Sequence, residues 1–533
     1  MISAASLSLD QAIGQMICPT LFGGQLRPET FDEATVLAEM ATFGWGGYIL
    51  FHGDRDMVRA RTSLLQRHTV VPLLFAADME HGAGHLIDGL TDLPPAMAFG
   101  AVDDPAMTAA MGAWTAAEAR QVGVNWVYAP VADVTNNPLN PIISIRSFGG
   151  DPARVAAHVT AFVTGSQAHG VLACAKHFPG HGDTATDSHT RLGIVPADRA
   201  RLAAVEWPPF QAAIAAGVAS IMTAHLAVPA LDAPDVPATL SRRIIDGVLR
   251  HELGFTGLVV TDALLMGGIT TVRQASEAAV EAILAGCDVL LMPPDPIATA
   301  TAIRTAVADG RLSEQRLYQS VERILAAKAR VQGPPPPPPA GHPALVAADV
   351  ARRAITLAKG PANTRIPDGF LAVTVLDGVA EALAEPWLTL IGTVRPGGTA
   401  VVSEDTDEAG WQALRVQAES APLVVLAVIS PIKVSKDRSL LPTSLLDRLS
   451  ALTRDLRTVV IGFSSPFIVS QFPDAEASLL TFGATEVQQT TMAESLRDGR
   501  GWHGTLPVTL PEVLTGVDTD STRPTDGKGP AFA

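Results

Sequence analysis

The sequence predicts an α/β protein that consists of an N-terminal (β/α)8-type, TIM-like barrel followed by a smaller α/β sandwich domain. A unit of helix, glycine and apolar strand recurs over roughly the first 330 residues, which is typical of such a barrel. The strands are nearly continuous apolar runs, and a run of six prolines then interrupts the pattern. An open, doubly wound sheet is the second choice for the first part.

The repeating unit is a helix that ends at a glycine and is followed at once by an apolar strand. It occurs at residues 41–52, 167–178, 214–225 and 283–294. Glycine readily adopts the left-handed conformation that ends a helix and releases the chain into the strand. Because both faces of these strands are apolar, we expect a parallel sheet that is covered by helices.

One segment without charged residues, 207–231, is long enough to span a bilayer. Pro208 and Pro209 stand where a helix would begin, Gly217 stands where it would end, and an apolar strand follows. We therefore expect a helix, a turn and a strand here, and no membrane partner.

The proline run divides the chain. It favours a stiff polyproline II spacer at residues 333–343, and a ligand for an SH3 domain is the less common role for one short run. We expect a catalytic barrel over 1–332 and an α/β domain over 344–515, with strands within 371–378, 387–392, 423–430, 458–465 and 477–483 and a helix over 486–499. The tail, 516–533, lacks apolar periodicity and is expected to be disordered.

The composition is that of a globular protein, with 47% apolar and 17% charged residues in a chain of 533. A net charge of −16 repels phosphate backbones, so nucleic acid is not an expected partner. Cys18, Cys174 and Cys287 lie far apart in apolar runs, which favours buried thiols over disulfides or a zinc site. The first residues show no secretory signal, so we expect a cytoplasmic enzyme, and its oligomeric state is left open.

Five apolar strands end in a residue that is costly to bury without a partner: Asp78, Asp133, His177, His225 and Asp262. In a barrel of parallel strands, the C-terminal ends open on one face, where barrel enzymes place their chemistry. A single polar residue often marks only the point at which a strand surfaces. Five together predict one polar pocket.

The stretch KHFPGHGDTATDSH, residues 176–189, allows two interpretations. In the first, zinc or a pair of metal ions is bound by His177, His181, His189, Asp183 and Asp187. Lys176 opposes this because it would place a cation where a metal site needs anions, and the glycines suit a mobile loop better than a rigid ligand cage. The sequence therefore favours no metal and no cofactor.

In the second interpretation, the same stretch performs acid/base catalysis in sugar transfer. Asp187 and His189 are two positions apart, so in extended backbone the carboxylate can accept the Nδ1 proton of the imidazole. A carboxylate in this position fixes the tautomer of a group that titrates near neutrality. Asp262 would be the nucleophile that attacks the anomeric carbon. A plainer interpretation of residues 187–189 is an Asx-turn beside a solvated histidine.

KHFPGHGDTATDSH strongly resembles the signature of the β-N-acetylglucosaminidases of glycoside hydrolase family 3, and VVTDALLMGGI resembles that family's nucleophile segment. Similarity extends to APVADVTNNPLNPIISIRSFG, to AADMEHG and, loosely, to GTLPVTLP, so it covers most of the chain. The resemblance implies a retaining double displacement. In this reaction Asp262 forms a glycosyl-enzyme, His189 is the acid/base, and Asp187 supports His189.

The resemblance also implies which residues hold the hydroxyls of the terminal sugar: Asp78, Arg146, Lys176 and His177. We add His225 to this substrate-binding set because it stands at a strand end. The implied substrate is a small cell-wall fragment that bears terminal N-acetylglucosamine on N-acetylmuramic acid, as in peptidoglycan recycling.

One turn departs from the family. Where the family usually reads D-x-E-G-G, residues 78–82 read DMEHG, so that His81 replaces a glycine, and His85 follows. We therefore expect a different pocket rim and acceptor preference. An imidazole acid/base tolerates a phosphate dianion that a carboxylate would repel, so phosphorolysis to a sugar 1-phosphate is the close rival to hydrolysis. Two rival functions from different classes are a metal-dependent hydrolase and a carbohydrate-binding protein without turnover.

Overall fold

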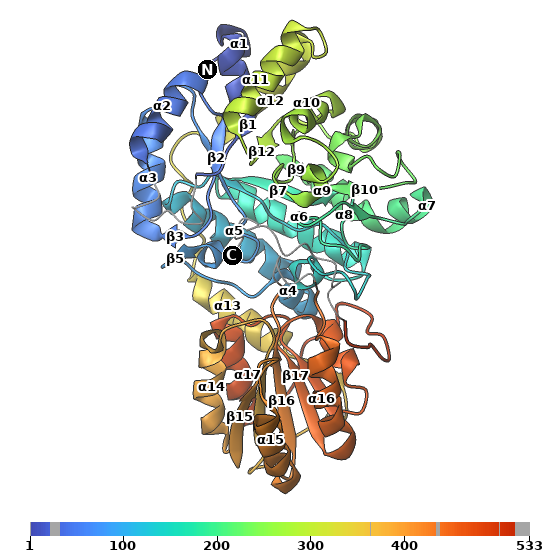
Figure 1. The fold of residues 1–533 in the computed structure, drawn as a ribbon. Coiled ribbons are helices and arrows are strands. Elements are labelled where there is room, and N and C mark those ends of the chain that lie inside the picture. Colours follow the sequence, from blue (N-terminus) through green and yellow to red (C-terminus); the bar gives the residue numbers. More distant parts are fainter. Residues whose placement is uncertain (1, 22–31, 363, 433–437, 500, 518–533) are drawn as a thin grey trace. The chain divides into compact units, whose positions relative to one another are not determined.

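The computed structural model describes residues 2–21, 32–362, 364–432, 438–499 and 501–517 (Figure 1). These residues form two compact units. The first is drawn from Met1–Asp92, Pro105–Val134 and Val155–Pro343, and the second from Leu93–Asp104, Thr135–Arg154 and Ala344–Ala533.

Two segments of the second unit, Leu93–Asp104 and Thr135–Arg154, fall within the range 1–332 that was predicted to form the barrel domain. The predicted domain of residues 1–332 therefore does not coincide with the first compact unit. Along the chain, each of these segments lies between two consecutive barrel strands. Their composition does not distinguish them from ordinary barrel loops. The main boundary, between Pro343 and Ala344, coincides with the end of the predicted linker.

The first unit is built on eight parallel strands: β1 (Ile17–Cys18), β2 (Gly47–Ile49), β4 (Leu74–Ala77), β6 (Trp126–Val127), β7 (Leu172–Phe178), β9 (Ser220–Thr223), β11 (Leu258–Val260) and β12 (Leu290–Leu291). Six of them pair in the order β11–β9–β7–β6–β4–β2, and β1 pairs with β12. Bridges from Thr20 to Ile49 and from Val260 to Val289 join the two sheets at both edges. The strands thus close into a barrel, which confirms the prediction and rules out the open doubly wound sheet.

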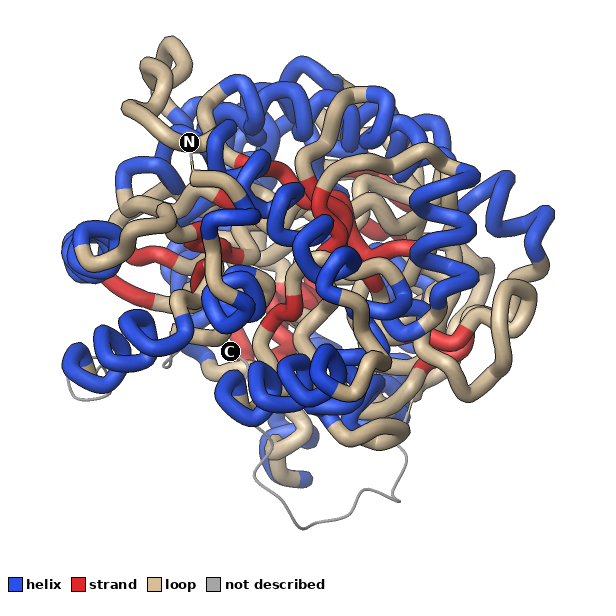
Figure 2. Tube along the Cα trace, turned by 90° about the horizontal axis from the view of Figure 1, so that it is seen from above, coloured by secondary structure: helices blue, strands red, loops and turns tan. Residues whose placement is uncertain are grey.

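Helices alternate with the strands and surround them (Figures 1 and 2). They are α1 (Leu9–Gln15), α2 (Glu33–Phe43), α3 (Arg55–Arg67), α5 (Pro105–Gln121), α6 (Pro152–Ala168), α8 (Pro208–Ala215), the π-helix η7 (Arg243–Glu252), α10 (Ala275–Ala285), α11 (Pro296–Ala308) and α12 (Glu314–Arg330). Shorter elements are η1 (Ala4–Ser6), β3 (Gly53–Asp54), η3 (Ala83–His85), β5 (Ile87–Asp88), β8 (Gly193–Ile194), α7 (Arg199–Arg201), η5 (Leu202–Glu206), β10 (Leu226–Ala227), η6 (Ala238–Leu240) and α9 (Gly267–Thr270).

The helix–glycine–strand unit forms as predicted. The glycines that close the four repeats, Gly44, Gly170, Gly217 and Gly286, have φ values of 61°, 84°, 74° and 127°. Side chains are strained at such angles, so glycine is what allows each helix to end and the strand to begin. Residues 207–231 contain α8, β9 and the short strand β10, and no helix among the described residues is long and apolar enough to cross a membrane.

The three cysteines lie in the barrel core. Cys18, Cys174 and Cys287 are buried and form no disulfide, as predicted. Burial raises the pKa of each thiol to about 12. They therefore stay protonated and behave as small apolar side chains.

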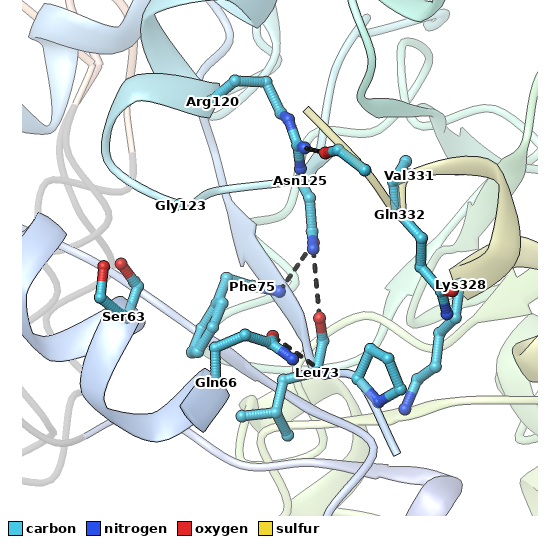
Figure 3. A pocket seen from close by; sticks show the side chains of 13 residues that line it. Ser63, Gln66, Leu73, Phe75, Arg120, Gly123, Asn125, Lys328, Val331 and Gln332 are labelled. Atoms are coloured by element: carbon cyan, nitrogen blue, oxygen red, sulfur yellow. Dashed lines mark hydrogen bonds between the residues drawn. The ribbon is translucent and has the colours of Figure 1, made fainter. Parts of the chain in front are cut away.

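A cavity of about 380 Å³ lies beside the residues that precede β4 and β6 (Figure 3). Asn125 links the starts of these strands, because its Oδ1 accepts a hydrogen bond from Phe75 N at 2.9 Å and its Nδ2 donates to Leu73 O at 3.1 Å. Lys328 also lines the cavity, and its buried Nζ donates to Gln15 Oε1 at 2.5 Å. Polar groups at this end of a barrel serve stability, whereas the chemistry lies at the opposite end.

The second unit contains a six-stranded mixed sheet in the order β13–β18–β17–β16–β14–β15. Its strands are β13 (Thr356–Lys359), β14 (Leu371–Leu376), β15 (Gly398–Val402), β16 (Val424–Ile429), β17 (Thr458–Gly462) and β18 (Ala477–Leu480). Among these described strands, only the β13–β18 pair is antiparallel. The helices are α4 (Ala96–Val102), η4 (Ser144–Arg146), α13 (Pro343–Ala354), η8 (Glu381–Ala384), α14 (Glu385–Ile391), η9 (Gly392–Val394), α15 (Glu408–Ser420), α16 (Thr443–Asp455), η10 (Pro466–Gln471) and α17 (Glu486–Asp498).

Helix and sheet share one core in this unit. Trp387 of α14 and Met492 of α17 belong to the same buried cluster as Val425 and Ile461 of the sheet. The predicted smaller α/β domain is therefore confirmed.

The prediction of a strand at residues 387–392 is wrong, because this segment belongs to α14 and η9. Pro386 occupies the first helical turn, and Trp387 and Ile391, one turn apart, are the buried residues of α14. A short apolar run does not distinguish a strand from a buried helix. The strands β13 and β15 were not predicted.

The predicted disordered tail begins too early. Val517 N donates a hydrogen bond to Leu441 O at 3.1 Å, which ties residue 517 to the second unit. Residues 518–533 lie outside the described residues. Within the predicted linker, residues 335–339 have no regular secondary structure, and α13 begins at its last residue, Pro343.

Candidate active site

The C-terminal ends of the barrel strands carry the polar residues that the sequence pattern singled out. Asp78 follows the last residue of β4, His177 is the second-to-last residue of β7, and Asp262 lies two residues after β11. His225 lies two residues after β9, whereas Asp133 lies six residues after the end of β6, just beyond the isolated bridge between Val131 and Lys176, so the predicted strand end at Asp133 is displaced. Because all eight strands run parallel, these five residues lie on one rim of the barrel.

The hydrogen bond predicted between Asp187 and His189 is present. His189 Nδ1 donates to Asp187 Oδ1 at 2.7 Å, and the main-chain N of His189 donates to the same oxygen at 2.9 Å. Asp187 is fully buried, whereas the His189 side chain keeps 22% exposure. The Asx-turn of the plainer interpretation is therefore present. The imidazole is not merely solvated beside it, however, because it bonds to the same carboxylate. With Nδ1 committed to the carboxylate, Nε2 is the nitrogen for proton exchange with a substrate.

Asp262 is in the form that a nucleophile needs. Burial by itself would raise the pKa of this carboxyl, but the nearby His225, His177 and His189 outweigh that effect and lower the pKa below its usual value. One oxygen, Oδ1, also accepts a hydrogen bond from Ala263 N at 2.8 Å. The side chain is therefore ionised at neutral pH.

The segment after Asp262 lies against the loop that carries His189. Gly267 N donates to His189 O at 2.9 Å, and Gly268 N donates to Ser188 O at 2.9 Å. A Cβ on Gly267 would lie 2.2 Å from the carbonyl oxygen of Thr190, so only glycine allows this approach. The backbone therefore holds the loop that carries His189 against the segment that follows Asp262.

Lys176 sits between two carboxylates. Its Nζ lies 2.5 Å from Asp78 Oδ1 and 2.6 Å from Glu80 Oε1, and its side chain is only 2% exposed. A buried ammonium is stable only when it is paired in this way. Glu80 was not among the predicted site residues, although its position two residues after Asp78 is a usable signal, because alternate residues of an extended segment point to the same side.

Asp133 orients His177. Its buried carboxylate accepts hydrogen bonds from His177 Nδ1 at 2.8 Å and from the main-chain N of His181 at 2.7 Å. Burial raises the pKa of Asp133, but His177 and His181 lower it further, so that the net shift is downward. The ionised carboxylate fixes the proton of His177 on Nδ1. The strand pattern identified Asp133, but its role as the partner of His177 was missed.

His225 was predicted to bind substrate, but its two ring nitrogens bond within the protein. Nε2 donates to Ala263 O at 3.0 Å, and Nδ1 lies 2.8 Å from Thr239 Oγ1. Burial lowers the pKa of this fully buried imidazole, which disfavours its charged form. Both ring nitrogens of His225 therefore have internal partners, as a buried polar ring needs, and its contact with a sugar stays a prediction.

Arg146 falls in the second compact unit, in η4. Its Nη1 donates to Ile142 O at 3.0 Å, which folds the side chain against its own turn. Its contact with a sugar stays a prediction.

The metal interpretation of residues 176–189 does not fit the geometry. The imidazole of His181 is bound by Thr184 Oγ1 at Nδ1 and by Ser188 Oγ at Nε2, at 3.0 and 2.9 Å. His177 and His189 pair with different aspartates, as described above. Among the described residues, the ligand atoms of this stretch do not converge on one point.

A closed parallel barrel with a carboxylate-supported imidazole and an ionised aspartate on its C-terminal rim defines an enzyme of the (β/α)-barrel class. The profile of the glycosyl hydrolase family 3 N terminal domain matches residues 8–327. The chain belongs to this family.

Similar proteins carry glycosidase names. A "Beta-N-acetylglucosaminidase/beta-glucosidase" from Cellulomonas fimi is 28% identical over 95% of this chain and 94% of its own. A "Beta-hexosaminidase" from Methylococcus capsulatus is 36% identical over 51% of this chain and 81% of its own. Both matches cover most of the relative's length.

Two solved structures have the same fold over nearly the whole chain. A family 3 β-N-acetylglucosaminidase from Paenibacillus sp. str. FPU-7 superposes with a TM-score of 0.83 at 30% identity, covering 95% of this chain and 100% of that one. The β-glucoside phosphorylase BglX bound to 2FGlc also has a TM-score of 0.83, at 25% identity and 95% coverage of both chains.

Proposed function

We propose that this enzyme is a retaining exo-β-N-acetylglucosaminidase that removes terminal, non-reducing N-acetylglucosamine. The observation that carries the proposal is the His189–Asp187 hydrogen bond, held beside the Asp262 segment by the Gly267 amide. The names of the relatives from Cellulomonas fimi and Paenibacillus support the choice of sugar.

In the first step, an oxygen of the Asp262 carboxylate attacks C1 of the sugar, and the bond from C1 to the leaving oxygen breaks. His189, protonated on both nitrogens, gives its Nε2 proton to that oxygen. Asp187 stabilises the imidazolium through Nδ1 and keeps the ring in place. The leaving group departs as a neutral alcohol, and a covalent glycosyl-enzyme remains.

In the second step, His189 Nε2 takes a proton from water as the water oxygen attacks C1. The bond between C1 and Asp262 breaks, and the carboxylate leaves as a stable anion because neighbouring histidines keep its pKa low. Two inversions at C1 give net retention of configuration.

The terminal sugar is held by groups of the first unit that the family resemblance implies, namely Asp78, Lys176 and His177. Asp78 keeps 34% exposure while it neutralises Lys176, so one carboxylate serves both the protein and a hydroxyl of the sugar. Asp133 presents His177 in one tautomer, which leaves Nε2 as the acceptor nitrogen of its ring. The natural substrates are peptidoglycan-derived fragments with N-acetylglucosamine on N-acetylmuramic acid, met during recycling in the cytoplasm.

Phosphorolysis is the second candidate. An imidazole acid/base does not repel an incoming phosphate dianion, and one solved relative is named a phosphorylase. The site would then make a sugar 1-phosphate in the second step with no change in the first.

Product analysis separates these activities. The full-length enzyme is incubated with p-nitrophenyl N-acetyl-β-glucosaminide, with and without inorganic phosphate, and the sugar is followed by NMR. We expect β-N-acetylglucosamine as the first product, at a rate that phosphate leaves unchanged. A sugar 1-phosphate as the main product would replace hydrolysis by phosphorolysis, and an α-anomer as the first product would refute retention. Absence of nitrophenol release would favour a binding protein, and loss of release after prolonged chelation would favour a metal-dependent hydrolase.

A further inference from the structure

The turn that departs from the family pattern carries a second cluster of polar side chains. His81, His85 and Asp92 each offer one ligand atom, and these atoms lie within 4.8 Å of one another. The cluster belongs wholly to the first unit. Its position is at the margin of the proposed sugar site, because His81 directly follows Glu80, whose carboxylate contacts Lys176.

The contacts within the cluster are close. His81 Nδ1 lies 2.9 Å from Asp92 Oδ1, and the rings of His81 and His85 have centroids 3.8 Å apart. The His81 side chain is 16% exposed and that of Asp92 is 42% exposed, so an ion from solvent can reach both. His85 is also exposed.

The backbone that carries these side chains is firmly held. Gly84 N donates to Thr91 O at 2.8 Å, which closes the loop between His85 and Asp92. Glu118 of α5 then anchors Thr91, accepting hydrogen bonds from its main-chain N at 2.9 Å and from its Oγ1 at 2.8 Å. The three potential ligands therefore need only side-chain rotation to converge.

Their chemistry suits a transition metal. Imidazole nitrogen and carboxylate oxygen bind zinc at roughly 2.0–2.2 Å, so ligand atoms in a tetrahedral site lie about 3.3–3.5 Å apart. A separation of up to 4.8 Å requires a shift of about an ångström in the side chains. Two histidines and one carboxylate also leave a fourth position for water, as in open zinc sites.

We propose that His81, His85 and Asp92 bind a divalent metal ion of the zinc class at the edge of the sugar site. Asp92 pairs with His81 in the described part of the chain, whereas the neighbouring acids Asp78 and Glu80 both pair with Lys176. The anionic ligand of the cluster is thus available to a metal. This binding does not depend on the proposed function, since the ion would lie beside the reacting groups and not among them.

The proposal is tested by titrating zinc chloride into metal-free, full-length protein and measuring the heat of binding. We expect one ion per chain, with an affinity at least tenfold lower in His81→Ala and in His85→Ala. We also expect zinc to raise the Tm of the wild type and not that of His85→Ala. Because His85 is exposed, that variant folds, and its Tm without zinc reports this directly.

The matched control is His251→Ala. His251 also faces an aspartate, with Nε2 3.6 Å from Asp246 Oδ1, but no second imidazole joins them among the residues searched for convergent ligands. Zinc affinity should therefore be unchanged in this variant. Wild-type protein that binds no zinc, or His81 and His85 variants that bind it as tightly as the wild type, would overturn the proposal.

Discussion

The main-chain oxygen of His189 accepts a hydrogen bond from the amide of Gly267 at 2.9 Å. Gly267 lies five residues after Asp262, and His189 lies two residues after Asp187. This hydrogen bond therefore connects the segment of the proposed nucleophile with the segment of the proposed acid/base. The connection is made through the backbone and not through the two side chains proposed to react. It also explains a local sequence requirement, because a side chain at position 267 would collide with the carbonyl of Thr190.

Replacing the nucleophile should abolish turnover and leave the fold intact. We expect Asp262→Ala to lose activity on the order of 10³-fold or more, since the carboxylate that attacks C1 is gone. Adding azide should restore release of an activated aryl group and yield a glycosyl azide. The control is Asp56→Ala, whose side chain is 76% exposed on α3. Near-normal turnover in Asp262→Ala with an unchanged Tm would contradict the assignment.

Loss of the acid should depend on the leaving group. We expect His189→Ala to slow the release of a sugar leaving group by about 10²–10⁴-fold. The release of nitrophenol should slow much less, because nitrophenolate leaves without protonation. The measurement is kcat/KM over a series of leaving groups. His68→Ala is the control, since that exposed ring bonds to Leu64 O of the preceding helix. Equal losses across the series would show that His189 is not the acid.

Buried Lys328 should make stability depend on pH. Burial lowers the pKa of its ammonium to about 7, whereas the unfolded chain keeps the ordinary, higher value. Between these two values unfolding takes up a proton, so the free energy of unfolding rises with pH, and below pH 7 the charged form opposes folding. From pH 7 to pH 9 we expect a rise of about 2 kcal/mol in the wild type relative to Lys328→Met.

Urea unfolding of both proteins at several pH values measures this difference. The exposed Lys359 provides the control, because Lys359→Met should follow the wild type at every pH. Loss of the hydrogen bond to Gln15 adds an offset that does not change with pH. Parallel curves for wild type and Lys328→Met would mean that Lys328 is charged in the folded protein.

Local patterns predicted much of the fold and of the site. Glycines after helices marked where four barrel repeats turn, and the polar residues that end five apolar runs lie at or after the ends of five strands, with Asp133 the furthest from its strand. The spacing of Asp187 and His189 predicted their hydrogen bond. These features depend on residues that are neighbours along the chain, so they can be seen without the fold.

Other features depend on contacts between distant segments. Residues 387–392 formed a helix because Trp387 and Ile391 pack into the core of the second unit, which no short pattern reveals. Likewise, the pairing of Asp133 with His177 and the contact of Lys176 with Glu80 join different strand ends.

The sequence by itself determined the barrel, the rim on which its polar residues gather and the pairing of one imidazole with its neighbouring acid. Only the tertiary structure decided the hydrogen-bond partners of His225, whose ring bonds Thr239 and the Ala263 carbonyl. The physical reason is that periodicity places a side chain on a face, whereas a buried polar atom takes whichever partner the packed strands bring within hydrogen-bonding distance.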